Sequence, residues 1–340
     1  MSKVTVCVGL DYHKDSIQVC VMDPAGKILA NRRCYNQVEA LVRLVAQFGN
    51  DVHAAVESCS GAAALADELA TRHGWSIHLA HPGYVARMKQ TPDKTDWADA
   101  RVIADLVRVG YLPKVWLAPE DVRQLRALVR YRQQLVDRRR TVKLRITGVL
   151  REARIAEPPS RWSKGWIAWL RTAEGLGTEA RWVINNHLNE YAHVVTLIKE
   201  AEDRLAAVTA GDPVVAQLMS LRGVGLITAV TIRAEIGRFD RFTTGKQLAR
   251  YCGLSPRNAS SGQRQADAGL IRAGNPQLRA TLIEAAHRLV RFDLRWGELG
   301  LRLREAGKPS CVVIAAVANR WVRWLFHQMQ GGAIELNAVA

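Results

Sequence analysis

The sequence predicts an α/β domain at the N-terminus, then a long helical hairpin, then an all-α C-terminal domain. Short β-branched runs alternate with helical patterns near the N-terminus, in the order βββαβαβα. Apolar residues at heptad spacing follow, and helical spacing continues through the remainder of the chain. This order implies a mixed sheet covered by helices at the N-terminus. We expect domains at residues 1–112, 113–212 and 213–340.

Three short strands open the chain. Residues 4–10 (VTVCVGL) form a β-branched apolar run, and residues 16–22 (SIQVCVM) alternate polar with apolar side chains. The sequence Asp-Pro-Ala-Gly at 23–26 is typical of a turn and leads to a third strand at 27–33. Tight turns between consecutive strands predict an antiparallel meander.

The rest of the N-terminal domain alternates helices with strands. Helical segments show apolar residues three and four positions apart, whereas the strands are short apolar runs. The predicted elements are a helix at 38–48, a strand at 53–57, a helix at 62–71, a strand at 75–80 and a helix at 95–109.

One long helix is predicted over residues 119–156. Its apolar residues recur every seven positions, at Leu128, Leu135, Val142 and Val149. Leu125 and Ile146 belong to a companion row beside this heptad row, and Arg132 and Arg139 interrupt the companion row. The incomplete seam therefore suits a helical hairpin or a partner-dependent coiled coil better than a free zipper. The prolines at 158–159 end this helix. Helices are then expected at 160–189 and 191–209, the latter antiparallel to the first.

The last third of the chain predicts packed helices. The segment LRGVGL at 221–226 resembles a helix–hairpin–helix turn, in which glycines let backbone N–H groups approach a phosphate. The same glycines also suit a turn between packed helices for steric reasons alone. Asn275 as N-cap and Pro276 at the first helical position open a helix at 277–291, and a final helix is expected at 310–329.

Composition limits the class of protein. The chain has 340 residues, of which 48% are hydrophobic and 24% charged, so it is a globular protein and not a disordered chain. Its longest apolar run, residues 311–318, is far shorter than the roughly 18 residues of a membrane helix. The first residues lack the charged-then-apolar pattern of a signal segment, so we expect none. The six cysteines show no C-x-x-C spacing. We therefore expect a cytoplasmic protein without a membrane partner.

Positive charge is concentrated after residue 110. Residues 1–110 contain 12 basic and 12 acidic residues, so the whole net charge of +16 lies in residues 111–340. This asymmetry favours an anionic partner for the second part, and we expect nucleic acid. The run Arg138, Arg139 and Arg140 taken alone is also typical of a solvated helix face.

Four carboxylates of the neutral N-terminal domain form a candidate metal site. Asp11 ends the first strand, Glu57 ends the fourth, and Asp96 and Asp99 lie three apart on one helix face. Adjacent strand ends and one helix face would bring all four to one edge of the sheet. Carboxylates this close require cations, and their oxygens select Mg²⁺ or Mn²⁺, which can assist phosphodiester chemistry.

Each acid also has a simpler explanation. Asp11 suits the start of a turn, and Glu57 suits an exposed strand end. Asp96 and Asp99 in the first turn of a helix would complement the helix dipole. Singly these explanations are favoured, but the joint pattern in a βββαβαβα domain favours metal-assisted phosphate chemistry.

Two groups of motifs go further than the individual residues. The N-terminal group comprises GLD at 9–11, VES at 56–58 and KTDWADA at 94–100. The C-terminal group comprises SLRGVG at 220–225, GLSPR at 253–257, SSG at 260–262, RAG at 272–274 and LR at 278–279. In this order, and over nearly the whole chain, they resemble IS110-family transposases, which have a RuvC-like DEDD domain.

The resemblance implies an RNase H/RuvC-like fold for residues 1–112 and a recombinase that moves an insertion sequence. It implies that Asp11, Glu57, Asp96 and Asp99 hold Mg²⁺ or Mn²⁺. It also implies that Ser261 is the nucleophile and forms a phosphoserine ester with the cut DNA strand. The implied nucleic-acid partners are donor and target double-stranded DNA and an element-encoded guide (bridge) RNA. The resemblance also implies a homodimer or tetramer in which the two domains meet across subunits and the long helices of residues 113–212 supply the dimer contacts. The implied location is the nucleoid of the bacterial cytoplasm.

Two other functions stay open. One is a metal-dependent, structure-specific nuclease of the Holliday-junction resolvase type, in which water attacks and Ser261 is inert. The other is a basic scaffold that binds nucleic acid and whose acids hold no metal.

The predicted contacts with nucleic acid are basic side chains of the long helix and of the C-terminal region. They are Arg138, Arg139, Arg140, Lys143, Arg257, Arg264, Arg272 and Arg279.

Overall fold

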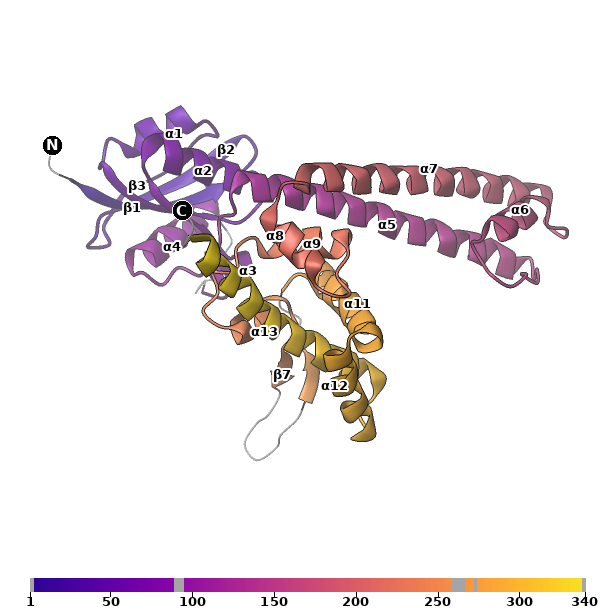
Figure 1. Cartoon of the computed structure of the whole chain (residues 1–340). Helices are drawn as coiled ribbons and strands as arrows, with labels where there is room; N and C mark the ends of the chain where they lie inside the picture. Colours follow the sequence, from indigo (N-terminus) through magenta and orange to yellow (C-terminus); the bar gives the residue numbers. More distant parts are fainter. Residues whose placement is uncertain (1–2, 89–94, 259–266, 272–273, 338–340) are drawn as a thin grey trace. The chain divides into compact units, whose positions relative to one another are not determined.

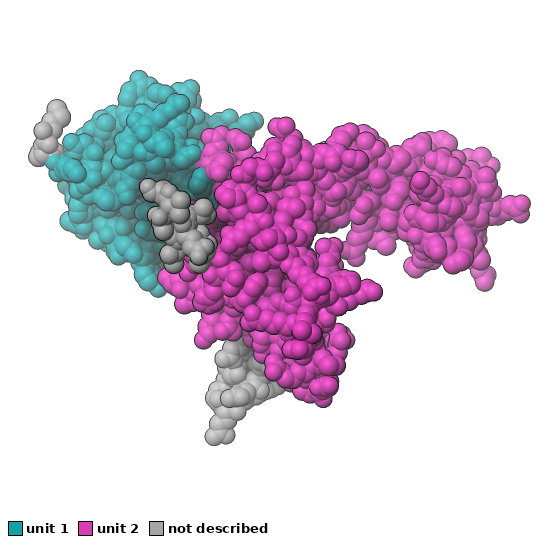
Figure 2. All heavy atoms as spheres, in the orientation of Figure 1, with its two compact units in different colours: residues 1–119 teal, residues 120–340 magenta. Residues whose placement is uncertain are grey.

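The computed structural model describes residues 3–88, 95–258, 267–271 and 274–337. It forms two compact units, residues 1–119 and 120–340 (Figure 1, Figure 2). Each unit has its own apolar core. The expected further division of the second unit at residue 212 stays a prediction. Among the described helices, none combines the length and apolar character needed to cross a membrane.

The first unit contains a six-stranded mixed sheet in the order β3-β2-β1-β4-β5-β6. The strands are β1 (Thr5–Tyr12), β2 (Ser16–Met22), β3 (Ile28–Tyr35), β4 (Asp51–Glu57), β5 (Ser76–Ala80) and β6 (Lys114–Val115). β1, β2 and β3 form an antiparallel meander, while β4 and β5 run parallel to β1. The predicted mixed sheet and meander are confirmed. β6 was not predicted, because a strand of two residues has no alternation to detect.

Helices cover both faces of this sheet. They are α1 (Val38–Val45), α2 (Ala62–His73), α3 (Pro82–Met88) and α4 (Asp96–Arg108). α1 and α2 pack on the face that carries Leu10. α4 covers the opposite face, where Ala100 and Ala104 contact the side chain of Cys7. Since alternate residues of a strand point to the same side, Asp11 lies on the α4 face.

Gly9 allows α4 to approach β1 closely. A Cβ atom at this position would overlap the carbonyl oxygen of Ala100 and the amide nitrogen of Ala104. Both are backbone atoms of α4, so no side-chain rotation relieves the overlap. Glycine at position 9 therefore sets the distance between the strand end that carries Asp11 and the helix that carries Asp96.

We expect Gly9→Ala to lower the free energy of unfolding by about 3 kcal/mol, because α4 must move away from β1. Chemical denaturation of the full chain measures this loss. Gly148→Ala is the control, since an added Cβ there meets no heavy atom within 4 Å. Its position inside a helix predicts a gain of about 0.5–1 kcal/mol. Equal free energies of unfolding for the Gly9→Ala and Gly148→Ala variants would contradict the conclusion that α4 approaches β1 closely at Gly9.

The second unit is mainly helical. Its helices are α5 (Glu120–Glu152), α6 (Lys164–Thr172), α7 (Thr178–Thr209), α8 (Pro213–Ser220), α9 (Leu226–Ile236), α10 (Gly245–Tyr251), α11 (Pro276–Phe292), α12 (Leu294–Glu305) and α13 (Ser310–Asn337). The long helix α5 is confirmed. The predicted helix break near residue 190 is wrong, because α7 is continuous there. The chain breaks instead between α6 and α7, where Gly175 has a φ of +82°.

α5 and α7 pack side by side as an antiparallel hairpin (Figure 1). Ile146 packs in one cluster with Ile184, and Arg132 forms an ion pair with Glu202 at 2.6 Å. Residue numbers therefore rise along α5 in the direction in which they fall along α7, so the antiparallel pairing expected for residues 191–209 is confirmed and extends over the longer helix α7. The incomplete apolar seam is explained in part, since a basic residue in the companion row has a carboxylate partner on the other helix.

The C-terminal part of the second unit is not all-α, so that prediction is wrong. β7 (Pro256–Asn258) and β8 (Asp267–Leu270) form a two-stranded antiparallel sheet. Strands of three and four residues are too short for alternation to be recognised in the sequence. Two predicted boundaries are confirmed: the segment 221–226 joins α8 to α9, and Asn275 caps α11 by accepting a hydrogen bond from the Gln277 amide at 2.9 Å.

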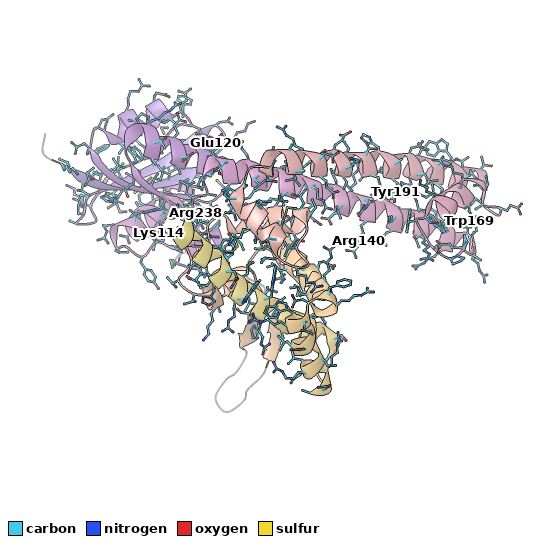
Figure 3. All side chains as sticks on the ribbon, in the orientation of Figure 1. Lys114, Glu120, Arg140, Trp169, Tyr191 and Arg238 are labelled. Carbon is cyan, nitrogen blue, oxygen red and sulfur yellow. The ribbon has the colours of Figure 1, made fainter. Side chains whose placement is uncertain are left out.

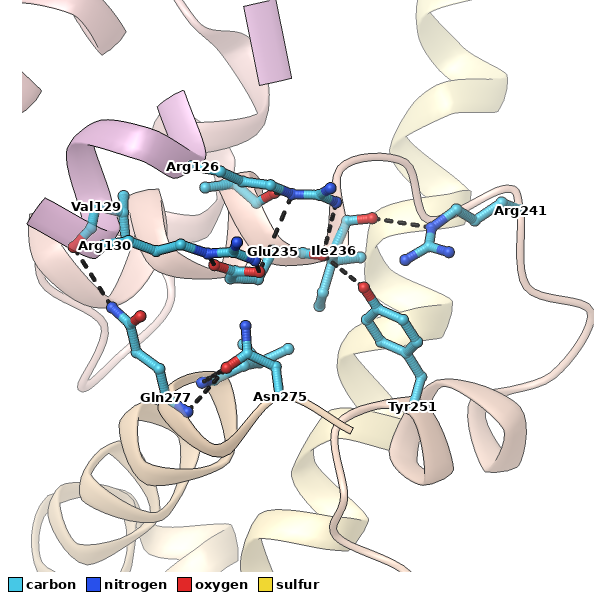
Figure 4. Close-up of polar contacts among 11 residues, drawn as sticks. Arg126, Val129, Arg130, Glu235, Ile236, Arg241, Tyr251, Asn275 and Gln277 are labelled. Atoms are coloured by element: carbon cyan, nitrogen blue, oxygen red, sulfur yellow. Dashed lines mark hydrogen bonds and ion pairs between the residues drawn. The ribbon is translucent and has the colours of Figure 1, made fainter. Parts of the chain in front are cut away.

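A buried polar cluster joins α5 to the C-terminal helices (Figure 4). Glu235, near the end of α9, is only 2% exposed. Arg130 of α5 donates two hydrogen bonds to its carboxylate, each of 2.9 Å. Arg126 donates to the carbonyl oxygens of Ala234 and Glu235, and the Tyr251 hydroxyl also donates to the latter. These donors satisfy carbonyl groups that the end of a helix leaves without helical partners.

Arg130→Ala is expected to lower the free energy of unfolding by about 3 kcal/mol, because it removes the bidentate partner of a buried carboxylate. The control is Arg238→Ala. Its partner Asp240 is as exposed as the arginine itself, with exposed side-chain fractions of 65% and 60%. We therefore expect that variant to lose less than about 1 kcal/mol. Urea denaturation measures the free energy of unfolding of both variants. Similar losses would contradict the conclusion that burial of the Glu235 carboxylate makes its ion pair important for stability.

Candidate active site

The predicted acids lie where β1 ends and α4 begins. β1 ends at Tyr12, directly after Asp11. α4 begins at Asp96, and its N-cap Thr95 accepts a hydrogen bond from the Ala98 amide at 3.2 Å. The close packing of α4 on β1 brings this helix start to the strand end.

His13 lies between the carboxylates of Asp11 and Asp96. Its Nε2 atom is 3.3 Å from an oxygen of each carboxylate. Arg33 of β3 donates a hydrogen bond of 2.7 Å to the same oxygen of Asp96. One ligand atom from each of Asp11, His13 and Asp96 lies within 4.8 Å of the other two. A single cation could therefore contact all three residues.

Glu57 and Asp99 lie on the same side of the sheet as Asp11. The parallel register of β1 and β4 leads to adjacent strand ends at Asp11 and Glu57. Asp99 is buried in α4, and its charge acts on the Asp11 carboxylate. The compact group of three ligand atoms includes neither Glu57 nor Asp99. The structure thus gathers the predicted acids in one region, with Asp11 and Asp96 at its centre.

The electrostatics of Asp11 favour a bound cation. Burial raises the pKa of Asp11, the nearby charge of His13 lowers it, and the charges of Asp96 and Asp99 raise it. A raised pKa means that the ionised carboxylate is disfavoured in its surroundings. A divalent cation among these carboxylates would relieve both the repulsion and the loss of hydration.

A chain of hydrogen bonds holds the first turn of α4 to the sheet. Gln18 of β2, which is only 7% exposed, donates to Asn31 of β3 at 2.7 Å. Asn31 in turn donates to the carbonyl oxygen of Trp97 at 2.9 Å. Since Trp97 follows Asp96, two strands of the meander fix the position of that carboxylate.

His13 and Arg33 are site residues that the sequence did not predict. His13 is two positions after Asp11, and residues two apart in an extended chain point to one side, so this signal was present. Arg33 could not be found in this way. It meets Asp96 only through the pairing of β3 with β2 and the packing of α4 on the sheet.

The donor set fits a divalent metal ion. Carboxylate oxygens are the ligands preferred by Mg²⁺ and Mn²⁺, while an imidazole nitrogen suits transition ions. Asp11, His13 and Asp96 would hold the ion directly. Asp99 and Glu57 add negative charge on the same side of the sheet.

The predicted nucleophile lies in a part of the chain that is not described. Of the site residues predicted from the sequence, Ser260, Ser261, Arg264 and Arg272 lie outside the described ranges. Two other predicted contacts with nucleic acid are placed. Arg257 is exposed on β7, and Arg279 of α11 donates a hydrogen bond to the carbonyl oxygen of Ile271 at 3.2 Å.

The basic residues predicted on α5 differ in their surroundings. Arg138 forms an ion pair of 2.8 Å with a glutamate of α7. The Lys143 nitrogen lies 4.7 Å from the centre of the Trp162 ring, and burial lowers the pKa of that lysine. Arg140 is exposed (Figure 3). Arg139 is partly buried. Their contact with nucleic acid stays a prediction.

Two family models match the chain. A model of the DEDD transposase domain of IS110 matches residues 8–155, which include all four predicted acids. A second model, described as transposase IS116/IS110/IS902 family, matches residues 215–300, which include Ser261. Together they cover more than half of the chain, in the order expected from the sequence motifs.

Curated relatives agree with these models. The transposase for insertion sequence element IS1111A of Coxiella burnetii is 28% identical over 289 residues, which are 84% of this chain and 78% of the relative. The transposase for IS1328 of Yersinia enterocolitica is 24% identical over 326 residues, covering 95% and 96%. Protein y4qE of Sinorhizobium fredii is 32% identical over 217 residues, 63% of this chain and only 52% of that relative's length. The chain therefore belongs to the IS110 family of transposases.

Proposed function

We propose that this transposase cuts and rejoins insertion-sequence DNA through a covalent phosphoserine intermediate on Ser261. The main support is the cluster of Asp11, His13 and Asp96 at the end of β1, within 4.8 Å of one another. Such a cluster can hold the divalent ion that phosphodiester chemistry needs. The match of a transposase family model to the segment around Ser261 supports the second half of the proposal.

The N-terminal unit is proposed to be an RNase H/RuvC-like domain. Three antiparallel strands precede two parallel strands, each joined through helices, and α4 follows. Acids at the end of the central strand and on α4 are the arrangement expected for such a domain. The match of the DEDD model to residues 8–155 supports this assignment.

In this proposal Asp11 and Asp96, with His13 beside them, hold Mg²⁺ or Mn²⁺ directly, and Glu57 and Asp99 complete the acidic group around the ion. When bound, the ion would polarise the scissile phosphate and reduce its repulsion toward an attacking oxygen. Asp11 and Asp96 provide the central carboxylates. Arg33 and the Asn31 side chain keep the first turn of α4 in place, so that Asp96 stays beside Asp11.

The chemical step conserves the number of phosphodiester bonds. The Ser261 hydroxyl loses its proton to a carboxylate or to water, and its oxygen bonds to phosphorus. The bond between phosphorus and one deoxyribose oxygen breaks, and that oxygen takes up a proton. Attack by a deoxyribose hydroxyl of another strand reverses these events and restores Ser261. No external energy source is needed for rejoining.

The proposed partners are donor and target DNA, an element-encoded guide RNA and further copies of the chain. The excess of basic residues after residue 110 supports binding of nucleic acid. Delegating base recognition to RNA pairing would leave no base-reading motif in the protein. The antiparallel hairpin of α5 and α7 is the element proposed to contact another subunit.

The test is to express the chain with its native flanking DNA, so that an element-encoded RNA is present, and to search for DNA linked covalently to protein. We expect an Mg²⁺-dependent adduct that protease treatment removes. Mg²⁺-dependent nicking without an adduct would instead support a nuclease that uses water. Binding of DNA and RNA without either product would support a non-catalytic scaffold.

A further inference from the structure

A basic groove lies between α12 and α13, and none of the basic residues singled out in the sequence is among its lining residues. It has a volume of about 510 Å³. Four arginines and two tryptophans dominate its lining: Arg295, Arg302, Arg320, Arg323, Trp296 and Trp324. His327 completes the polar side.

Helical spacing brings these side chains to one side of each helix. On α12 the lining residues Arg295 and Arg302 are seven positions apart, which is nearly two turns. On α13 the lining residues Arg320, Arg323 and His327 follow the same three- and four-residue spacing. The two faces therefore present their positive charges to the same groove.

The charge of this groove is not balanced by carboxylates. No acidic side chain lines it, and within the described residues none of its four arginines forms an ion pair. Elsewhere in the same unit arginines do have acidic partners, for example Arg132 with Glu202 and Arg233 with Asp212. Guanidinium groups gathered without counter-charges repel one another, so the arrangement favours an anionic ligand.

The tryptophans position one arginine but offer little surface for stacking. The Arg295 guanidinium carbon lies 4.9 Å from the ring centre of Trp296 and 5.8 Å from that of Trp324. Trp296 is only 5% exposed, and its ring meets that of Trp324 edge-on, with centres 6.2 Å apart. Proteins that bind single strands use open aromatic faces on which bases stack. This groove lacks such a face and instead presents guanidinium groups that match phosphate oxygens.

We propose that the groove between α12 and α13 binds the phosphate backbone of duplex DNA, independently of base sequence. This inference rests on the proposed function only in taking DNA as the substrate. It adds a site that positions the duplex on the C-terminal helices. Arg302 and Arg320 are exposed, and it is Arg295 whose guanidinium lies over the tryptophan rings, so Arg302 and Arg320 are the residues to test.

The experiment measures affinity of the full chain for a short fluorescent DNA duplex as salt is varied. Each phosphate contact contributes about 0.9 to the slope of log affinity against log salt. The double variant Arg302→Gln/Arg320→Gln is therefore expected to reduce the slope by about 2 and to weaken binding roughly 50- to 100-fold near 0.1 M salt. The same loss is expected for duplexes of unrelated sequence.

The control variant is Lys199→Gln/Arg238→Gln. It removes the same charge from exposed side chains of the same unit that already pair with Asp203 and Asp240. We expect its salt slope to match that of the wild type. Equal losses in the two variants would show a general charge effect and overturn the proposal, as would an unchanged slope in the groove variant.

Two further arms separate this site from other interpretations. An RNA duplex of the same sequence is tested in parallel, and loss of RNA affinity with DNA affinity kept would overturn the proposal. Ser261→Ala is expected to bind DNA with the wild-type slope. If no covalent adduct forms in any variant but the groove variant still loses affinity, the phosphoserine mechanism fails while the groove proposal stands.

Discussion

Ser261→Ala is expected to form no covalent adduct with DNA, a loss of at least about 10³-fold, because alanine has no oxygen that can form the ester. The same variant should keep its fold, its divalent-metal binding and its affinity for DNA. Labelled DNA resolved on a denaturing gel, with and without protease treatment, measures the adduct. Rejoined product should disappear together with the adduct, since the proposed rejoining step starts from the phosphoserine ester.

Ser260→Ala is the matched control for this prediction, because it makes the same small change one position earlier. We expect it to form the adduct at close to the wild-type level. Loss of the adduct in Ser260→Ala alone would move the nucleophile to that residue. An adduct that persists in both single variants would rule out both serines.

Asp11→Asn is expected to lower the rate of strand cleavage by at least about 10³-fold, since it removes a central carboxylate of the proposed metal site. An amide is neutral and binds divalent cations more weakly than a carboxylate does. Cleavage and adduct formation should both decline, and paramagnetic resonance should show weaker Mn²⁺ binding. The metal measurement separates a lost ligand from a lost catalytic base.

The free energy of unfolding of the Asp11→Asn variant provides a control for the predicted loss of cleavage. Because burial raises the pKa of Asp11, its ionised form is disfavoured in the folded chain at neutral pH. Replacing it with neutral asparagine should leave the free energy of unfolding unchanged or raise it. Asp15→Asn, which changes an exposed aspartate of the following turn, should keep wild-type cleavage. An Asp11→Asn protein that cleaves DNA normally would remove the metal cluster from the mechanism.

Periodicity and residue type predicted the parts of this fold that depend on local pattern. A β-branched apolar run, alternation and a turn sequence located the three strands of the meander, and the heptad spacing located α5. The dipeptide at Asn275 located the start of α11, because a cap and a proline act within one helical turn. The same reasoning failed for α7, for which a break was predicted near residue 190. The helix is continuous there because it packs on α5 along its length, and the local sequence does not record that packing.

The sequence by itself determined that acids lie at the ends of the first and fourth strands and open a helix, and that the excess of positive charge lies after residue 110. Only the tertiary structure decided that His13 and Arg33 join Asp96, that Gly9 brings α4 onto β1, and that arginines of α12 and α13 share a groove. The spacing of apolar residues predicts which side of a helix or strand is buried, since burial repeats with the period of that element. It does not predict which distant segment covers that side, because the covering segment depends on the register of strands and on packing between helices.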